Sequence, residues 1–207
     1  METCTGDSAL RAGNEYLYQI MAEQNIETLN DLGVKKIVTS CPHCFQTLGK
    51  DYEKLGGHYE VIHHSQLLEE LIAEGRLKPG TEKLPGTAAF HDSCYLARHN
   101  GIMEQPRKIA AEALGKPAAE PERNRDKGLC CGAGGARMWM EEKLGHKNVN
   151  AERTEELLND GADTVVTSCP FCKTMLSDGV KACGKDDDVK VMDIAEMLAA
   201  TDKNGAE

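Results

Sequence analysis

Cysteine dominates the chemistry that is available to this 207-residue chain, which contains nine cysteines. Five of them share a distinctive spacing, with 35 residues between the first and an adjacent pair and 37 residues between that pair and a Cys-x-x-Cys motif. These five are Cys94, Cys130, Cys131, Cys169 and Cys172. Clustered cysteines in a chain of the reducing cytosol more often bind metal or do redox chemistry than form disulfides. The spacing therefore predicts a metal or redox centre.

The adjacent pair Cys130-Cys131 favours a multi-iron cluster over a single ion. Neighbouring side chains in an extended segment point to opposite sides, so both reach one ion only through a sharp turn, which Gly132 permits. Zinc usually takes four ligands, commonly as two short pairs, which fits five cysteines poorly. We therefore expect an iron–sulfur cluster, with a zinc-stabilised scaffold or a redox sensor as the alternative.

The segment that carries the Cys-x-x-Cys motif occurs twice. Val-Thr-Ser-Cys-Pro-His-Cys at residues 38–44 reappears 128 residues later, with phenylalanine in place of histidine. In each copy a helix ending near a glycine precedes a short strand, and a proline then suits the first turn of the next helix. A second strand and an amphipathic helix complete each copy. The predicted strands are 36–39, 59–62, 164–167 and 189–192, and the closing helices are 65–73 and 194–200.

Strands alternating with helices predict an α/β fold of two tandem repeated units, each a small parallel sheet flanked by helices. Residues 87–91 form the predicted first strand of the second unit, but nothing equivalent precedes Cys4, so the first unit is expected to be truncated at its N-terminus. The predicted boundaries are a degenerate unit at 1–78, a linker at 79–86, a complete unit at 87–201 and a tail at 202–207. We therefore expect the C-terminal, cluster-bearing portion of a larger enzyme, in which Met1 is not the true start.

The first unit keeps only three cysteines of the pattern, Cys4, Cys41 and Cys44. Cys4-Thr5-Gly6 stands where Cys-Cys-Gly would be, and the upstream cysteine is absent. Three thiolates can hold a cluster with one open iron, or with a ligand from a missing segment, or they can hold nothing. These alternatives stay open from the sequence.

The pattern Cys-x35-Cys-Cys-Gly-x36-Cys-x-x-Cys resembles the cysteine-rich CCG domain found in the B-type subunit of heterodisulfide reductase and in related iron–sulfur proteins. The strings at 91–98 and 130–139 resemble a narrower branch, the heterodisulfide-reductase-related membrane oxidoreductases linked to electron-transfer flavoprotein. This resemblance implies a [4Fe–4S]-type cluster, non-cubane in some members, on the five cysteines of the second unit. It implies the same role for Cys4, Cys41 and Cys44 only if the first unit binds a cluster.

The resemblance also implies an oxidoreductase subunit that passes electrons from a flavoprotein towards quinone. A membrane-anchored partner, or a missing N-terminal region, would supply the quinone end. A disulfide-reducing cluster enzyme of the heterodisulfide reductase type is the alternative. No side chains form a convincing acid–base pair or triad, so no catalytic residue is predicted. Gly132-Ala133-Gly134-Gly135 lacks the spacing of a nucleotide-binding loop, and no flavin site is apparent.

Charge and hydropathy narrow the partners. The net charge is −10 and no basic stripe is present, which argues against nucleic acid. No apolar run approaches the roughly 20 residues that span a bilayer, and the start lacks the features of a signal peptide. We expect a cytoplasmic protein that lies peripherally on the inner face of the membrane through its partner.

Three residues near the predicted cluster carry specific expectations. His91 and Asp92 either orient the cluster loop and tune its potential through hydrogen bonds, or simply pack at the end of a strand. Trp139 is expected to open a helix and to lie in the core.

Overall fold

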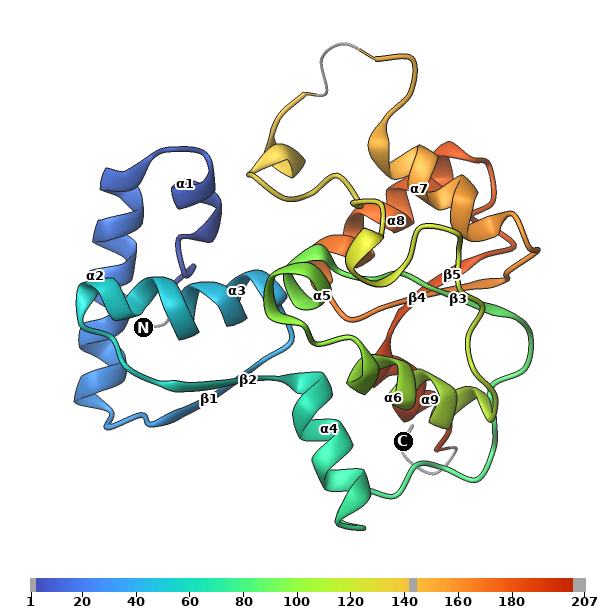
Figure 1. Ribbon diagram of the computed structural model, residues 1–207, viewed down its shortest axis with the longest axis horizontal. Helices are drawn as coiled ribbons and strands as arrows, with labels where there is room; N and C mark the ends of the chain where they lie inside the picture. The colour runs from blue at the N-terminus through green and yellow to red at the C-terminus, as the bar shows by residue number, and fades with distance from the viewer. Residues whose placement is uncertain (1–2, 142–144, 203–207) are drawn as a thin grey trace.

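The computed structural model describes residues 3–141 and 145–202. Two separate parallel sheets lie at opposite sides of the molecule, with helices α3 and α5 between them (Figure 1). The first unit contains α1 (Asp7–Arg11), α2 (Glu15–Asp31), β1 (Lys36–Thr39), α3 (Pro42–Gln46), the helical turns η1 (Thr47–Asp51) and η2 (Tyr52–Leu55), β2 (Glu60–His63) and α4 (His64–Ala73). The second contains β3 (Ala88–Phe90), α5 (Cys94–Asn100), α6 (Glu104–Leu114), η3 (Arg125–Lys127), η4 (Arg137–Trp139), α7 (Val149–Leu158), β4 (Thr164–Thr167), α8 (Pro170–Ala182), β5 (Lys190–Asp193) and α9 (Ile194–Ala200).

The strand topology confirms the predicted α/β class. β1 and β2 pair in parallel, and β3, β4 and β5 form a second parallel sheet in that order. The last strand of each sheet begins one residue later than predicted, at Glu60 and Lys190. Residues 203–207 of the predicted tail and the start at Met1 lie outside the described residues.

The repeated segments fold as their residue types require. Pro42 and Pro170 stand in the first turn of α3 and α8, where the missing N–H costs nothing. Gly33 and Gly161 follow α2 and α7 with φ of 65° and 74°, which glycine adopts without steric cost. This local chemistry sets both turns that lead into and out of β1 and β4.

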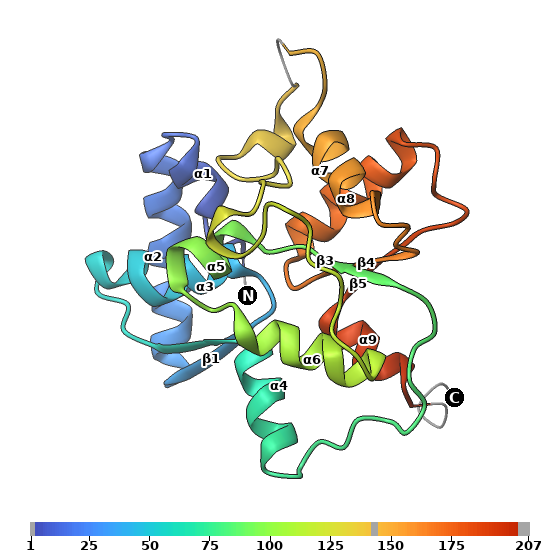
Figure 2. The ribbon, with the colours of Figure 1, turned by 45° about the vertical axis from the view of Figure 1, so that its right-hand side comes forward.

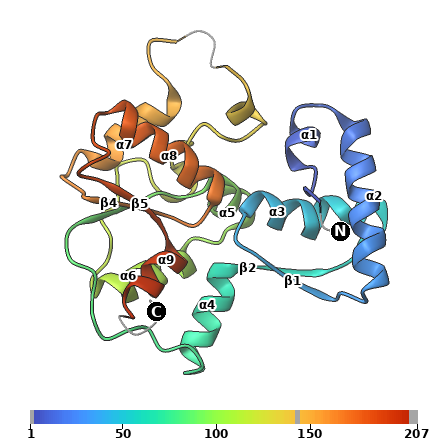
Figure 3. The same cartoon turned by 180° about the vertical axis from the view of Figure 1, so that it is seen from behind.

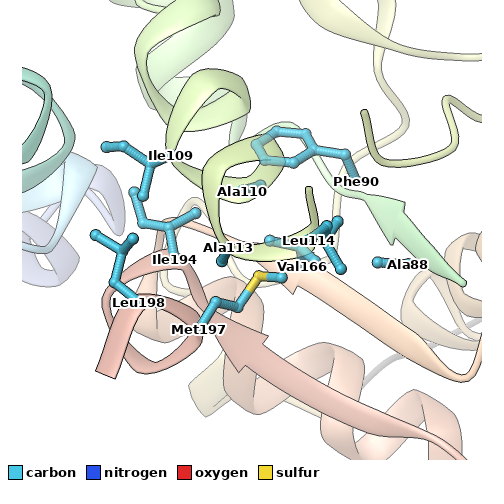
Figure 4. Close-up of a cluster of buried hydrophobic side chains, with 10 residues drawn as sticks. All are labelled: Ala88, Phe90, Ile109, Ala110, Ala113, Leu114, Val166, Ile194, Met197 and Leu198. Carbon is cyan, nitrogen blue, oxygen red and sulfur yellow. The ribbon is translucent and has the colours of Figure 1, made fainter. Parts of the chain in front are cut away.

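Two buried clusters sandwich the second sheet. One joins the sheet to α6 and α9 and consists of Ala88, Phe90, Ile109, Ala110, Ala113, Leu114, Val166, Ile194, Met197 and Leu198 (Figure 4). The other joins the opposite face to α7 and α8, and it contains Cys131, Cys169 and Cys172. Leu68 and Ile72 of α4 pack against the first cluster, so the last helix of the first unit also covers the core of the second.

The expectation for Trp139 is wrong. It lies in the short turn η4 with 69% of its surface exposed, and its indole N–H donates to Ser8 Oγ at 3.3 Å. Gly135 and Ala136 both adopt positive φ, which is incompatible with a helix starting there. Within the described ranges, no helix combines the length and the hydrophobicity needed to cross a bilayer.

Candidate metal centre

The five cysteines of the second unit meet at one edge of its sheet. Cys94 begins α5 just after β3, and Cys169 is the N-cap of α8 just after β4. Because the carboxyl ends of parallel strands share an edge, these two residues are brought together from 75 positions apart. Cys172 lies one turn into α8, and the pair Cys130-Cys131 arrives on a loop. All nine cysteines of the chain are free thiols.

A sharp turn after the adjacent pair orients its sulfurs. Gly132 has φ of 91°, and its backbone N–H donates to Cys130 Sγ at 3.3 Å. Hydrogen bonds from Cys131 and Cys94, aided by this N–H, lower the pKa of Cys130 to about 2. The same contacts with Cys130, together with burial, raise the pKa of Cys94 and of Cys131. A thiolate at Cys130 is therefore stabilised by its two neighbouring thiols.

The second thiolate of the site is at Cys169. Complete burial acts against its charge, but hydrogen bonds from Cys172 and Cys41 hold the pKa of Cys169 well below its usual value. Contacts with Cys131 and Cys169 in turn raise the pKa of Cys172 well above its usual value. Without a cation, these sulfurs therefore alternate between thiol and thiolate. Ionising all of them at such close quarters requires a positively charged core, as a metal cluster provides.

The cysteines of the first unit do not form an isolated group. The sulfur of Cys169 lies against Cys41, and this contact, followed by that with Cys44, shifts the pKa of Cys41 to about 12. Cys4 is exposed and accepts from Gly6 N–H at 3.5 Å, while Thr5 Oγ1 lies 3.6 Å from Cys44 Sγ. The sequence suggested two separate sets, because nothing in the spacing shows that they face one another.

Equivalent residues of the repeat touch each other across the boundary between the units. Cys41 contacts its counterpart Cys169, and the His43 ring lies 4.9 Å from that of its counterpart Phe171. Contacts between equivalent residues indicate a pseudo-twofold axis between the two Cys-Pro-x-Cys motifs. His43 also stacks on Tyr95 of α5 at 4.1 Å, and Figure 2 shows α3 and α5 side by side at this boundary.

A buried ion pair fixes His43 in this position. Its Nδ1 lies 2.8 Å from Asp7 Oδ2, and both side chains are almost fully buried. The other Asp7 oxygen accepts from Arg11 and from the hydroxyl of Thr47. Asp7 was not expected from the sequence, although an acidic residue three positions after Cys4 was the available signal.

His91 faces the sulfurs of the second unit. One of its ring nitrogens and the sulfurs of Cys131 and Cys172 lie within 4.8 Å of one another. Arg153 Nε–H donates to His91 Nδ1 at 3.0 Å, so the ring proton sits on Nε2. Burial and then Arg153 lower the pKa of His91 to about 3, which keeps the imidazole neutral. His91 is thus arranged as a hydrogen-bond donor rather than as a metal ligand, since a ligand would need a free lone pair.

Two buried donors test whether an iron–sulfur cluster fits. His91 Nε2 and the Thr167 hydroxyl are buried, and neither has a partner within residues 3–141 and 145–202. Buried donors almost always find an acceptor, and cluster sulfur accepts such hydrogen bonds. A donor next to converging thiolates fits a cluster that carries sulfide of its own. It fits a bare metal ion less well, because the ion adds no acceptor.

Asp92 plays the other of the two roles expected for it. Its carboxylate accepts from both terminal nitrogens of Arg107 at 2.7 Å and from the backbone N–H of Arg125 at 2.6 Å. It therefore ties the end of β3 to α6 and to the loop at η3. Arg153, which is fully buried and also bonds Glu156, is a site residue that was not expected from the sequence. A lone arginine on the apolar face of the helix at 149–158 was its signal.

Comparison with known proteins assigns the chain to a family. The family described as "Cysteine-rich domain" (CCG) matches residues 1–49 and 88–177. The chain is 47% identical over 203 residues to an "EtfAB:quinone oxidoreductase" of Syntrophomonas wolfei, covering 95% of this chain and 28% of that protein. It is 44% identical over 198 residues to a "Probable iron-sulfur-binding oxidoreductase FadF" of Bacillus subtilis, covering 96% of this chain and 28% of that protein.

A more distant relative comes from an archaeon. The D-type subunit of a dihydromethanophenazine:CoB--CoM heterodisulfide reductase of Methanosarcina barkeri is 33% identical over 208 residues, which cover 96% of this chain and 49% of that protein. The chain thus spans between about a quarter and a half of the length of these relatives. All three relatives are described as oxidoreductases or as part of a reductase, and each matches almost all of this chain.

Proposed function

Because the chain belongs to the cysteine-rich CCG domain family, we propose that it is an iron–sulfur electron-transfer module within a larger oxidoreductase. Five convergent free cysteines beside the buried, unpartnered His91 Nε2–H carry this proposal. The residues proposed to hold the cluster are Cys94, Cys130, Cys131, Cys169 and Cys172. The cluster, proposed to be of the [4Fe–4S] type, would supply one-electron transfer.

The protein surrounding these cysteines has two functions in this proposal. Cys131, Cys169 and Cys172 are buried in the core of the second unit, which keeps water from the thiolates. Backbone and side-chain donors, among them Gly132 N–H and His91 Nε2–H, stabilise negative charge on sulfur. No described residue is needed as a general acid or base for electron transfer alone.

The partners follow from the relatives. A relative named as an EtfAB:quinone oxidoreductase supports a flavoprotein as electron donor and a quinone as final acceptor. Both would be engaged by the larger protein, and we propose that this chain lies at the cytoplasmic face of the membrane within it. Another relative, from Chromohalobacter salexigens, is described as a "Probable membrane-anchored ferredoxin", which supports this placement.

Metal analysis of anaerobically purified protein tests the proposal. We expect about four irons and about four acid-labile sulfides per chain, with visible absorption and an EPR signal of a reduced cluster. Cys169→Ser should lose most of the iron, whereas Cys183→Ser, which alters a cysteine outside the motif, should retain it. One zinc and no iron would contradict the proposal. About eight irons would show that Cys4, Cys41 and Cys44 hold a second cluster.

Disulfide reduction is the second candidate function. The facing pair Cys41 and Cys169, and the heterodisulfide reductase relative, favour it. Reduced electron-transfer flavoprotein mixed with the iron-loaded protein separates the two candidates. Rapid reduction of the cluster supports electron transfer from a flavoprotein. An inert cluster, combined with turnover of a thiol disulfide under a chemical reductant, would instead support the second candidate.

A further inference from the structure

The outer edge of β1 has room for a strand that the second unit already possesses. β4 is flanked by β3 and β5, whereas within the described residues β1 pairs with β2 alone. Val166 of β4 is completely buried, but its counterpart Val38 is 46% exposed. We propose that this edge, with the groove beside it, receives a third parallel strand. The strand would come from a segment of the same polypeptide upstream of residue 1.

The groove has the shape left by a removed strand. It has a volume of about 560 Å³ and lies between α2 and β1, at the lower rim of the first unit in Figure 3. Its apolar lining consists of Leu29, Leu32, Val34, Ile37, Val38 and Leu48.

The repeat identifies what this lining would cover. Three lining residues, Leu29, Ile37 and Leu48, correspond by the 128-residue offset to residues of the second unit. Their counterparts are Leu157, Val165 and Leu176. All three counterparts belong to the buried cluster that contains Ala89 of β3. The same side chains are therefore covered by a strand in one unit and exposed to a groove in the other.

The backbone of β1 is oriented to accept this strand. In the second unit the carbonyl of Val166 accepts from His91 N–H at 2.8 Å, at the end of β3. In the first unit Glu60 N–H donates to the carbonyl of Lys35, so odd-numbered residues of β1 face β2 and Val38 faces outward. An unpaired edge beside an apolar groove is the arrangement that strand addition uses.

Three observations favour an upstream segment of the same chain. Thr3 and Thr5 line the groove, so the chain enters the first unit beside it. In the second unit β3 precedes the Cys130-Cys131 pair, and the same order before Cys4 places the missing strand outside residues 1–207. The matched relatives are up to about three and a half times longer than this chain, which leaves length for such a segment.

The strand would also affect the cysteines of the first unit. β3 leads directly into the loop that carries Cys94, and a strand on β1 would end at the equivalent place, beside Cys41. A thiolate delivered there would complete the first set. That consequence rests on the proposed function, whereas docking of the strand does not.

A graft tests the seat with a strand of known sequence. A copy of residues 86–129 is joined directly before Cys4, which reproduces the order of the second unit. Hydrogen–deuterium exchange over residues 36–39 should slow about tenfold or more relative to the unextended protein. The matched control carries Ala89→Pro in the grafted copy only, because proline removes an N–H that would pair with β1. This control should exchange as fast as the unextended protein.

Three results would overturn the proposal. One is equally fast exchange of residues 36–39 in the graft and its proline control while residues 164–167 stay protected. Another is slowing in the unextended protein that grows with protein concentration, because it identifies a second copy as the occupant. The third needs no graft: in the dilute unextended protein, residues 36–39 should exchange about tenfold faster than residues 164–167, and equal protection would mean that the edge is not free. None of these readouts depends on iron.

Discussion

The imidazole of His91 sits between a buried guanidinium and the sulfurs of the proposed cluster. Arg153 occupies Nδ1 and thereby fixes the tautomer that directs an N–H towards Cys131 and Cys172. Hydrogen bonds to cluster sulfur raise the reduction potential, because they stabilise the extra negative charge of the reduced state. A single side chain, set by one arginine of a distant helix, is therefore expected to tune the centre.

Replacing His91 tests this role. His91→Phe should lower the midpoint potential by about 40 mV, which corresponds to about 1 kcal/mol for one hydrogen bond in a one-electron couple. His91→Gln keeps a side-chain N–H and should recover part of the shift. EPR-monitored redox titration measures both, and His58→Phe, at an exposed position, is the matched control. An unchanged potential in an iron-replete His91→Phe protein would show that the donor does not act on the cluster.

At the scale of elements, the helix starts of the two units solve the same problem differently. His63 and Asp193 are equivalent N-caps, and each forms a capping box with the helix that follows. His63 Nδ1 faces Ser65 Oγ at 2.8 Å, and Nε2 lies 3.3 Å from the carbonyl of Ser40. Burial, and then His64, lower the pKa of His63 to about 3. Helix α4 therefore has a cap that works only when it is uncharged.

This cap predicts a pH dependence of stability. The pKa of His63 is lower in the folded state than the usual value of about 6.5, so the unfolded chain binds more protons as the pH falls below that value. Its contribution is complete above pH 6.5 and is lost progressively towards pH 3. At pH 5.5 the loss is about 1.4 kcal/mol.

Denaturation at two pH values measures this effect. Between pH 7.5 and pH 5.5, the wild type should lose about 1.4 kcal/mol more stability than His63→Asn, since asparagine also caps helices and does not titrate. The groups facing His63 are His64 and Asp193, and both remain in the variant. Identical pH slopes for the two proteins would contradict this account of the cap.

At the scale of the whole molecule, the two units meet where the cysteines are. Cys41 contacts Cys169, and His43 lies between Tyr95 and Phe171. A second contact joins His64 Nε2 to Asp193 Oδ1 at 3.1 Å. Loss of a cluster at this boundary should therefore be felt on both sides of it.

Removal of the cluster tests this coupling. Treatment with a chelator and an oxidant should speed amide exchange at residues 41–46 as well as at residues 169–174, because ionised or oxidised sulfurs would face each other without a cationic core. The helices α6 and α9 share a separate apolar cluster and should keep their protection. Mass spectrometry of both forms provides the comparison. A change confined to residues 169–174 would show that the units are independent.

The regular elements could be predicted because their signals are local. Alternating hydrophobicity, prolines at helix starts and glycines after helix ends placed β1, β4 and the helix at 194–200 at their observed bounds. Trp139 went wrong because two positive-φ residues before it prevent a helix, and Ala136 carries no glycine signal. His63 and His64 are buried at the boundary between the units, which no local pattern indicates.

By itself, the sequence determined the α/β class, the repeat and the set of cysteines that can serve as ligands, because residue type and spacing fix these properties. The assignment of those ligands remains a prediction. Only the tertiary structure decided that Cys41 lies against Cys169, that Arg153 fixes the proton of His91, and that β1 has an open edge beside a groove. The two residue pairs lie 128 and 62 positions apart along the chain. Such relations depend on how helices and strands pack, and chain spacing does not encode packing.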